Sequence, residues 1–104
     1  MTKDTDDILE RLIKLGMREY NAKIVIALYT IGIAKAGDLH KLTGVPRGRV
    51  YDALNDLIDL GVVVKTNTVP AYYYTVDAEQ AYYSIHKKYL DKIMEIRDCV
   101  EELQ

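Results

Sequence analysis

Residues 41–64 read K-L-T-G-V-P-R-G-R-V-Y-D-A-L-N-D-L-I-D-L-G-V-V-V, and this stretch decides the fold. It predicts a turn and then a helix from Pro46 to about Leu60, because proline suits the first turn of a helix. Gly61 suits the position just past a helix end, and the valines that follow it are typical of a strand. With a short helix expected over residues 36–43, the pattern predicts a helix-turn-helix followed by a strand.

The helix predicted after the turn has an unfavourable distribution of charge. Arg47 and Arg49 lie in its first turn, at the positive end of the helix dipole, and its aspartates come later. Each exposed charge at the wrong end typically costs ~0.3–1 kcal/mol. A helix selected for stability alone would reverse this order. Either the arginines meet an external polyanion at the helix N-terminus, or they are two solvated residues of a surface turn.

The composition is that of a globular protein with a locally basic segment. The chain has 104 residues, 49% hydrophobic and 29% charged, which suits one domain. A net charge of −2 argues mildly against a nucleic-acid-binding protein, although the distribution of charge matters more than the sum. The acidity is concentrated in residues 77–104, and basic residues gather in the middle of the chain: Lys35, Lys41, Arg47, Arg49 and Lys65, with His40 beside them.

Several classes of protein are excluded by what the sequence lacks. There is one cysteine, Cys99, so no disulfide can form within the chain. No signal sequence and no apolar run of membrane-spanning length is present, so we expect a cytoplasmic protein without a membrane partner. We find no nucleophile with a base, paired-carboxylate site, phosphate-binding glycine loop or metal-ligand cluster, and therefore expect no enzyme, no cofactor and no metal.

Two helices are predicted before the quoted stretch. The first ends at Gly16, and the second runs from about Arg18 to Ile31 and is apolar on most of its sides, which indicates a central helix. A minimal strand is expected at Ile33. In the short helix that follows, Leu39 and Leu42 are expected to face inward.

Two β-prone runs follow the helix of the quoted stretch. Val62–Lys65 and Ala71–Val76 bracket a short polar tip, which predicts a β-hairpin. Tyr72, Tyr73 and Tyr74 are consecutive in the second strand, so Tyr73 must face the opposite side from its two neighbours.

A long amphipathic helix is predicted at the C-terminus. Asp77 can cap it with Gln80 three residues on, and it runs to about Leu103, a length of ~40 Å. Apolar residues and one histidine repeat at alternating spacings of four and three, which is a heptad seam: Tyr82, His86, Tyr89, Ile93, Ile96, Val100 and Leu103. The seam is longer than a small domain can cover. We expect a second copy of the chain to cover it; the alternative is packing on the N-terminal helix of the same chain.

Several motifs together resemble the DNA-binding domain of archaeal TrmB-type transcriptional regulators. They are L-G-M-R-E-Y-N-A-K-I-V-I-A-L, G-V-P-R-G-R-V-Y-D-A-L, L-I-D-L-G-V-V and P-A-Y-Y-Y-T-V-D-A-E, and the resemblance covers about residues 12–85. It implies that the hairpin is a wing, that Tyr73 packs inward, and that the last helix is a dimer contact. The sequence departs from the family at Arg18, where Ser or Thr usually caps the helix.

The resemblance and the residue patterns together predict a mainly α fold with a small β-wing (α+β). We expect one winged helix-turn-helix domain over residues 1–104, with its core at about 17–76 and a dimerisation helix at 77–104. Larger members of the family carry a C-terminal domain that binds sugars. This chain ends at Gln104, inside the predicted dimer helix, so no sugar ligand is expected.

The expected function is sequence-specific binding of double-stranded DNA by a homodimeric transcriptional regulator. Arg49 and Asn55 are candidates for base contacts, Arg47, Lys41 and His40 for phosphate contacts, and the wing for the backbone or minor groove. The full set of predicted DNA-binding residues is Lys35, His40, Lys41, Pro46, Arg47, Gly48, Arg49, Tyr51, Asn55, Lys65, Thr66, Asn67, Thr68 and Tyr72. Two alternatives are a protein–protein interaction module of the transcription machinery and a nonspecific DNA-binding protein.

Overall fold

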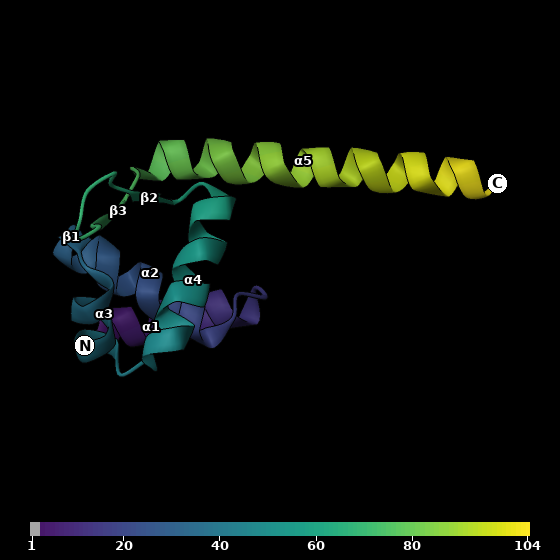
Figure 1. Ribbon diagram of the computed structural model, residues 1–104. Helices are drawn as coiled ribbons and strands as arrows, with labels where there is room; N and C mark the ends of the chain where they lie inside the picture. The colour runs from purple at the N-terminus through teal and green to yellow at the C-terminus, as the bar shows by residue number, and fades with distance from the viewer. Residues whose placement is uncertain (1–2) are drawn as a thin grey trace.

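A computed structural model describes residues 3–104, which form five helices and three short strands (Figure 1). In chain order these are α1 (Lys3–Lys14), α2 (Glu19–Ile31), β1 (Ile33–Ala34), α3 (Ala36–Thr43), α4 (Arg47–Leu60), β2 (Val63–Lys65), β3 (Tyr73–Thr75) and α5 (Ala78–Leu103). The predicted order of elements, including the minimal strand at Ile33, is confirmed. This is a mainly helical winged-helix fold with a small antiparallel sheet.

The helix-turn-helix is formed by α3 and α4. Gly44 ends α3 with φ 75°, a left-handed conformation that glycine adopts without strain. Our placement of Pro46 inside α4 is wrong by one residue: Pro46 has ψ 144° and is the N-cap, so α4 starts at Arg47. The carbonyl of Pro46 accepts the amide N–H of Val50 at 3.0 Å, which is the first hydrogen bond of the helix.

The core lies between α2, α3 and α4. Ile24 and Leu28 of α2 are fully buried, and Leu39 of α3 is fully buried beside them. From α4, Leu54 and Leu57 are 1% exposed. Burying each side chain of this size contributes about 1.5–3 kcal/mol, so these positions fix how α4 lies on α2. The prediction that α2 is the central helix is confirmed.

The three strands form one antiparallel sheet in the order β1-β3-β2, with Lys65 opposite Tyr73. Tyr73 is buried, whereas Tyr72 and Tyr74 are partly exposed on the other side, as predicted. The strands are shorter than predicted because the tip takes up more of the hairpin. Thr66 closes this tip: its amide donates to the carbonyl of Tyr72, and its Oγ1 accepts the amide of Tyr72, both at 2.8 Å.

Helix α5 begins with the predicted cap and then leaves the domain. Asp77 Oδ1 accepts the amide of Gln80 at 2.8 Å. The first turns of α5 pack on the core through Ala81 and Ile85, but every residue from position 89 to 104 is exposed, and the helix projects far beyond the rest of the molecule (Figure 1). The alternative that the seam packs on α1 of the same chain is therefore wrong. None of the helices described in residues 3–104 is long and apolar enough to span a membrane.

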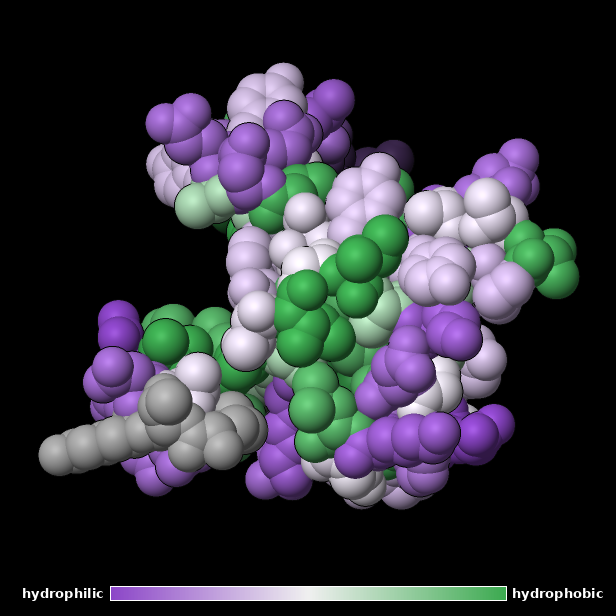
Figure 2. All heavy atoms as spheres, turned by 90° about the vertical axis from the view of Figure 1, so that its left-hand side faces the viewer, coloured by the Kyte–Doolittle hydropathy of each residue, from purple (hydrophilic) through white to green (hydrophobic). Residues whose placement is uncertain are grey.

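One expected core position is exposed. Leu42 of α3 is 58% exposed, because α1 does not close over the end of α3. Instead Leu42 lies at an open groove of about 530 Å³ between α1, α2 and α3, together with Leu9, Ile26 and Ile31. Apolar surface on the side of the molecule away from the free end of α5 is visible in Figure 2. The prediction that Leu42 faces inward is wrong.

Candidate nucleic-acid interface

A concave basic surface lies between α3, the start of α4 and the wing. We call it the basic pocket; it has a volume of about 510 Å³ and is lined by Lys35, Ala36, Gly37, Asp38, Lys41, Arg47, Tyr51, Lys65, Pro70, Ala71 and Tyr73. Its lining brings four cationic side chains together with one carboxylate. Residues 35 and 65 are thirty positions apart in the sequence, and the pairing of β2 with β3 places the wing lysine beside the helix-turn-helix.

The single carboxylate of the basic pocket already has a structural role. Asp38 Oδ2 accepts the backbone N–H of Lys35 at 3.2 Å, which satisfies a free amide at the start of α3. The first turn of α4 contains no acidic residue, so Asp38 is, among the described residues, the one anionic group that lines the pocket beside Arg47. The charge excess and the helix N-terminus both favour an anionic group such as a phosphate at this place.

A second concave surface lies on the other side of α4, towards the start of α2. We call it the paired-charge pocket; it has a volume of about 480 Å³ and is lined by Arg18, Tyr20, Asn21, Arg49, Asp52, Ala53, Asn55 and Asp56. It contains two arginines and two aspartates, so its charges cancel. The two sides of α4 therefore differ in charge, with the excess of positive charge on the wing side.

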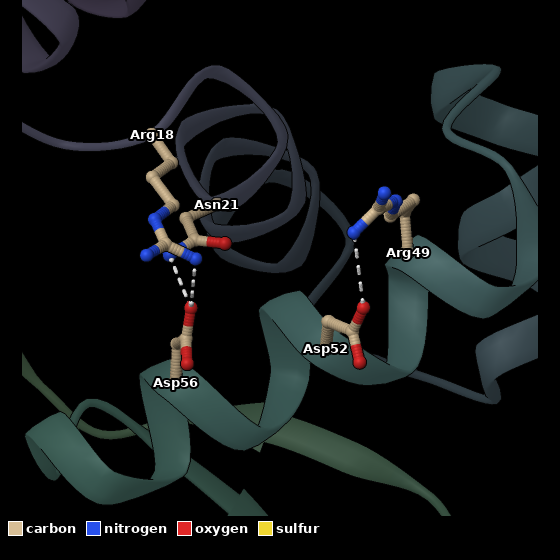
Figure 3. Close-up of polar contacts among 5 residues, drawn as sticks. All are labelled: Arg18, Asn21, Arg49, Asp52 and Asp56. Atoms are coloured by element: carbon tan, nitrogen blue, oxygen red, sulfur yellow. Dashed lines mark hydrogen bonds and ion pairs between the residues drawn. The ribbon is translucent and has the colours of Figure 1, made fainter.

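The charged side chains of the paired-charge pocket are engaged with one another (Figure 3). Asp56 Oδ2 lies 3.0 Å from Asn21 Nδ2, which donates to it, and 3.9 Å from Arg18 Nη1. Arg49 Nη1 lies 3.5 Å from Asp52 Oδ2 one turn along α4. These side chains are 46–83% exposed in their ion pairs, so each pair contributes only ~0–1 kcal/mol and opens easily.

Eleven of the fourteen predicted DNA-binding residues fall into three groups, and the other three lie in the helix-turn-helix: His40 in α3, Pro46 at the N-cap of α4 and Gly48 in its first turn. Lys35, Lys41, Arg47, Tyr51 and Lys65 line the basic pocket, and Arg49 and Asn55 line the paired-charge pocket. Thr66, Asn67, Thr68 and Tyr72 form the wing tip, where Thr66 Oγ1 and Thr68 Oγ1 share a hydrogen bond of 2.7 Å. The first two groups line pockets on opposite sides of α4, and the third is the tip of the hairpin that carries Lys65.

Two predicted residues have surroundings that the sequence did not reveal. The Nδ1 atom of His40 lies 2.7 Å from the carbonyl oxygen of Val45, so this ring nitrogen is used within the turn of the helix-turn-helix. Gly48 lies in the first turn of α4, and a side chain there would meet nothing within 4 Å. The surface at Gly48 is therefore open, and a bound molecule can approach the backbone of α4 closely.

Arg18 and Asn21 line the paired-charge pocket, but they were not among the binding candidates predicted from the sequence. The sequence presents Arg18 only as a poor cap for α2, and the structure confirms that its side chain makes no cap hydrogen bond. Both residues are recognised only by their closeness to Asp56 in the folded structure. Asn21 and Asp56 are 35 positions apart, and a contact over that separation leaves no local pattern in the sequence.

The floor of the basic pocket carries a neutral phenol. Burial, and then the nearby Tyr51, raise the pKa of Tyr73 above its usual value of 10.0. The Tyr73 hydroxyl therefore keeps its proton at neutral pH and adds no negative charge to the pocket. In the described part of the chain, no three His, Cys, Asp or Glu side chains gather in a way that would hold a metal ion.

Comparison with known proteins supports a regulatory family. Residues 12–79 match the model of the family described as "Sugar-specific transcriptional regulator TrmB". The chain is 30% identical over 98 residues to the HTH-type sugar sensing transcriptional regulator TrmBL1 of Pyrococcus furiosus, an alignment that covers 94% of this chain. It covers 29% of TrmBL1, so the chain spans less than a third of the length of that relative.

Solved structures share the fold. TrmBL2, an archaeal chromatin protein described as having a novel mode of DNA binding, matches with a TM-score of 0.77 and 20% identity over 95% of this chain and 38% of that one. A mutant MarR from E. coli complexed with operator DNA matches with a TM-score of 0.56 and 15% identity over 97% of this chain and 86% of that one. Family and fold are those of DNA-binding transcription regulators and not of enzymes. The matched residues run from the end of α1 through α2, the whole helix-turn-helix and the wing to the first residues of α5, and the chain therefore belongs to the TrmB family of transcriptional regulators.

Proposed function

We propose that this chain binds specific sequences of double-stranded DNA as a homodimeric transcriptional regulator, with α4 in the major groove. The observation that carries the proposal is the basic pocket, which concentrates Lys35, Lys41, Arg47 and Lys65 near the N-terminal end of α4, a helix with one exposed face. A major groove about 12 Å wide accepts an α-helix, and the wing beside α4 then reaches the backbone or the minor groove.

Base contacts are assigned to the paired-charge pocket. Arg49 can donate two hydrogen bonds to guanine, and Asn55 can pair with adenine, each worth about 1–3 kcal/mol of discrimination. To do so Arg49 must leave Asp52. The ion pair between them is exposed and contributes ~0–1 kcal/mol. The exchange is favourable on these magnitudes, so the ion pair holds Arg49 near α4 without preventing base contact.

Phosphate contacts are assigned to the basic pocket. If its four cations each neutralise one phosphate, the slope of log affinity against log salt concentration is about −3.6 for each domain. A homodimer doubles this value. The excess of acidic residues in the chain as a whole lies in α5, away from the basic pocket, and so does not oppose the contact.

Homodimerisation is assigned to α5. Its seven seam residues from Tyr82 to Leu103 are exposed, and an apolar stripe that runs along about six turns of helix in water is unfavourable without a partner. We expect Ile96→Asp to raise the dimer dissociation constant at least tenfold, because it buries a charge in the seam. Met94→Asp is the matched control, since Met94 is similarly exposed but lies outside the seam. Equal sedimentation behaviour of both variants would argue against this interface.

The proposal is tested by fluorescence anisotropy with labelled DNA from the protein's own upstream region. A shuffled sequence is the control, and both are measured at two salt concentrations. Steep weakening with salt marks phosphate contacts, and binding tens of times tighter to the native sequence marks a sequence-specific regulator. Equal binding to both would identify a nonspecific DNA-binding protein. No binding at low salt would favour the interaction-module alternative, to which the acidic α5 is suited.

Two variants separate the assigned roles of the pockets. Arg49→Ala should lower affinity for the native sequence far more than for the shuffled one, because it removes a base contact. Lys41→Ala should weaken binding to both sequences alike and reduce the salt slope by ~0.9 per domain. If Arg49→Ala instead reduced both affinities equally, Arg49 would be a phosphate contact.

A further inference from the structure

We infer that the exposed face of α5 pairs with α5 of a second copy in the antiparallel direction, and that the end of each helix reaches an apolar groove at the base of the other. This inference rests on the proposed homodimer and adds its orientation and its contact with the domain. Three observations carry it: the shape of the seam, the charges beside it, and the position of the groove.

The seam is widest near the domain. There Tyr82, Ile85, His86, Tyr89, Leu90 and Ile93 line a shallow apolar surface of about 330 Å³. Ile85 and Leu90 flank the heptad positions and broaden the apolar face. Beyond Ile93 the face narrows to Ile96, Val100 and Leu103. A wide half and a narrow half fit together when two copies run in opposite directions, because each wide half then faces a narrow one.

The charged residues that flank the seam favour the same direction. In a parallel pair, Lys92 lies beside Arg97 of the second copy, and this like-charge contact occurs twice. In an antiparallel pair that places Ile93 opposite Ile96 of the second copy, Lys92 faces Cys99 and Arg97 faces Leu90. No two like charges then meet beside the seam.

The distribution of charge along α5 also favours the antiparallel direction. Residues 84–93 carry three lysines and one aspartate, a net +2 besides His86, whereas residues 94–104 carry four acidic residues and one arginine, a net −3. An antiparallel pair brings the basic half of each helix beside the acidic half of the other. A parallel pair brings acidic halves together, which is destabilising.

An apolar groove lies where the partner helix would end. It has a volume of about 430 Å³ and lies between α1, α2, the end of α4 and the base of α5, with Leu12, Met17, Tyr29, Leu60 and Ile85 among its lining residues. Ile85 belongs both to this groove and to the seam. With Ile93 opposite Ile96, Leu103 of the second copy lies opposite His86, one residue from Ile85. Leu103 is 86% exposed in the single chain and gains a partner there.

Pulsed electron paramagnetic resonance on the full chain tests the orientation. In a Cys99→Ser background, one spin label is placed at Glu79 and, in a separate variant, at Asp91; both residues are exposed. In the antiparallel pair Glu79 lies 14 residues before Ile93, and Glu79 of the second copy lies 17 residues before Ile96. These 31 residues correspond to ~46 Å along the helices. Asp91 is separated from its copy by seven residues, or ~10 Å along the axis, so this label reports dimerisation in either orientation.

Three outcomes are distinguishable. A short distance at Asp91 with a distance of ~46 Å or more at Glu79 supports the antiparallel pair. Short distances at both sites, within ~20 Å for adjacent helices, overturn the inference and leave the homodimer intact. Absence of any intermolecular distance at both sites overturns the inference together with the homodimer, while the DNA-binding assay tests the rest of the proposed function separately.

Discussion

Substitution of Gly61 by alanine should loosen the junction between α4 and α5. Gly61 ends α4 with φ 86°, and an added Cβ would lie 2.6 Å from Ser84 Cβ and 2.9 Å from its Oγ. The left-handed conformation costs a non-glycine residue about 1–2 kcal/mol, and overpacking costs a further ~1–3 kcal/mol. The free energy of unfolding should therefore fall by about 2–5 kcal/mol, a large part of the ~5–15 kcal/mol of a typical domain.

The structure supplies two controls for this variant. Gly44→Ala has the same left-handed cost, at φ 75°, but its Cβ meets nothing within 4 Å, so it should lose only about 1–2 kcal/mol. Ser84→Gly removes the obstructing atoms and leaves Ser84 Cα at 3.9 Å. The double variant Gly61→Ala with Ser84→Gly should therefore be more stable than the sum of the two single effects predicts.

Urea unfolding followed by circular dichroism measures all four variants at one protein concentration, because dimerisation makes apparent stability depend on concentration. With a slope of about 1–3 kcal/mol per molar urea, the expected loss moves the midpoint by about 1 M or more for Gly61→Ala. If Gly61→Ala were no less stable than Gly44→Ala, or if Ser84→Gly gave no rescue, α5 would not pack on the end of α4 as described.

Three further variants probe the interface and the fold. Asp52→Asn should tighten binding to shuffled DNA severalfold in the anisotropy assay, because it removes a carboxylate that repels phosphate; unchanged affinity would mean that Asp52 points away from DNA. Thr66→Val removes the hydroxyl that accepts the Tyr72 amide, at a cost of ~1 kcal/mol, and hydrogen exchange of that amide should quicken if the wing tip depends on it. Burial, and then the charge of Asp77, raise the pKa of Tyr29 above 10.0, so the unfolded chain loses this proton first and stability falls as pH rises past ~10. Tyr29→Phe should make that fall shallower in urea titrations between pH 8 and 11, and an equally steep fall would exclude a contribution from Tyr29.

Local sequence signals, such as helix-ending glycines and strand alternation, were enough to predict the helix-turn-helix and the wing. Gly61 ends α4 at the predicted position because a left-handed residue is needed there. The alternation of Tyr72, Tyr73 and Tyr74 followed from strand geometry, and the resemblance added which of them is buried. Pro46 was misplaced by one residue because proline is compatible with both the first turn and the residue before it, and only its ψ decides between them.

Features that depend on the angles and positions at which helices pack against one another could not be predicted from the sequence. The contact of Arg18 and Asn21 with Asp56 requires the angle between α2 and α4, which no short pattern encodes. The exposure of Leu42 depends on where α1 stops covering α3. The separation of the candidate site into a basic and a neutral half likewise arises from the fold, since Arg47 and Arg49 are two residues apart but line opposite sides of α4.

The end of α4 is completed by a residue from the next helix. The last turn of α4 contains no basic side chain, and Lys88 of α5 donates from Nζ to the carbonyl oxygen of Asp59 at 2.6 Å. A cation at the C-terminal end stabilises a helix, and for α4 this cation is supplied by Lys88 of α5. A fragment cut at residue 77 would keep every side chain of the basic pocket and still have a frayed α4. The first three turns of α5, which also pack on the core through Ala81 and Ile85, therefore belong structurally to the winged-helix domain.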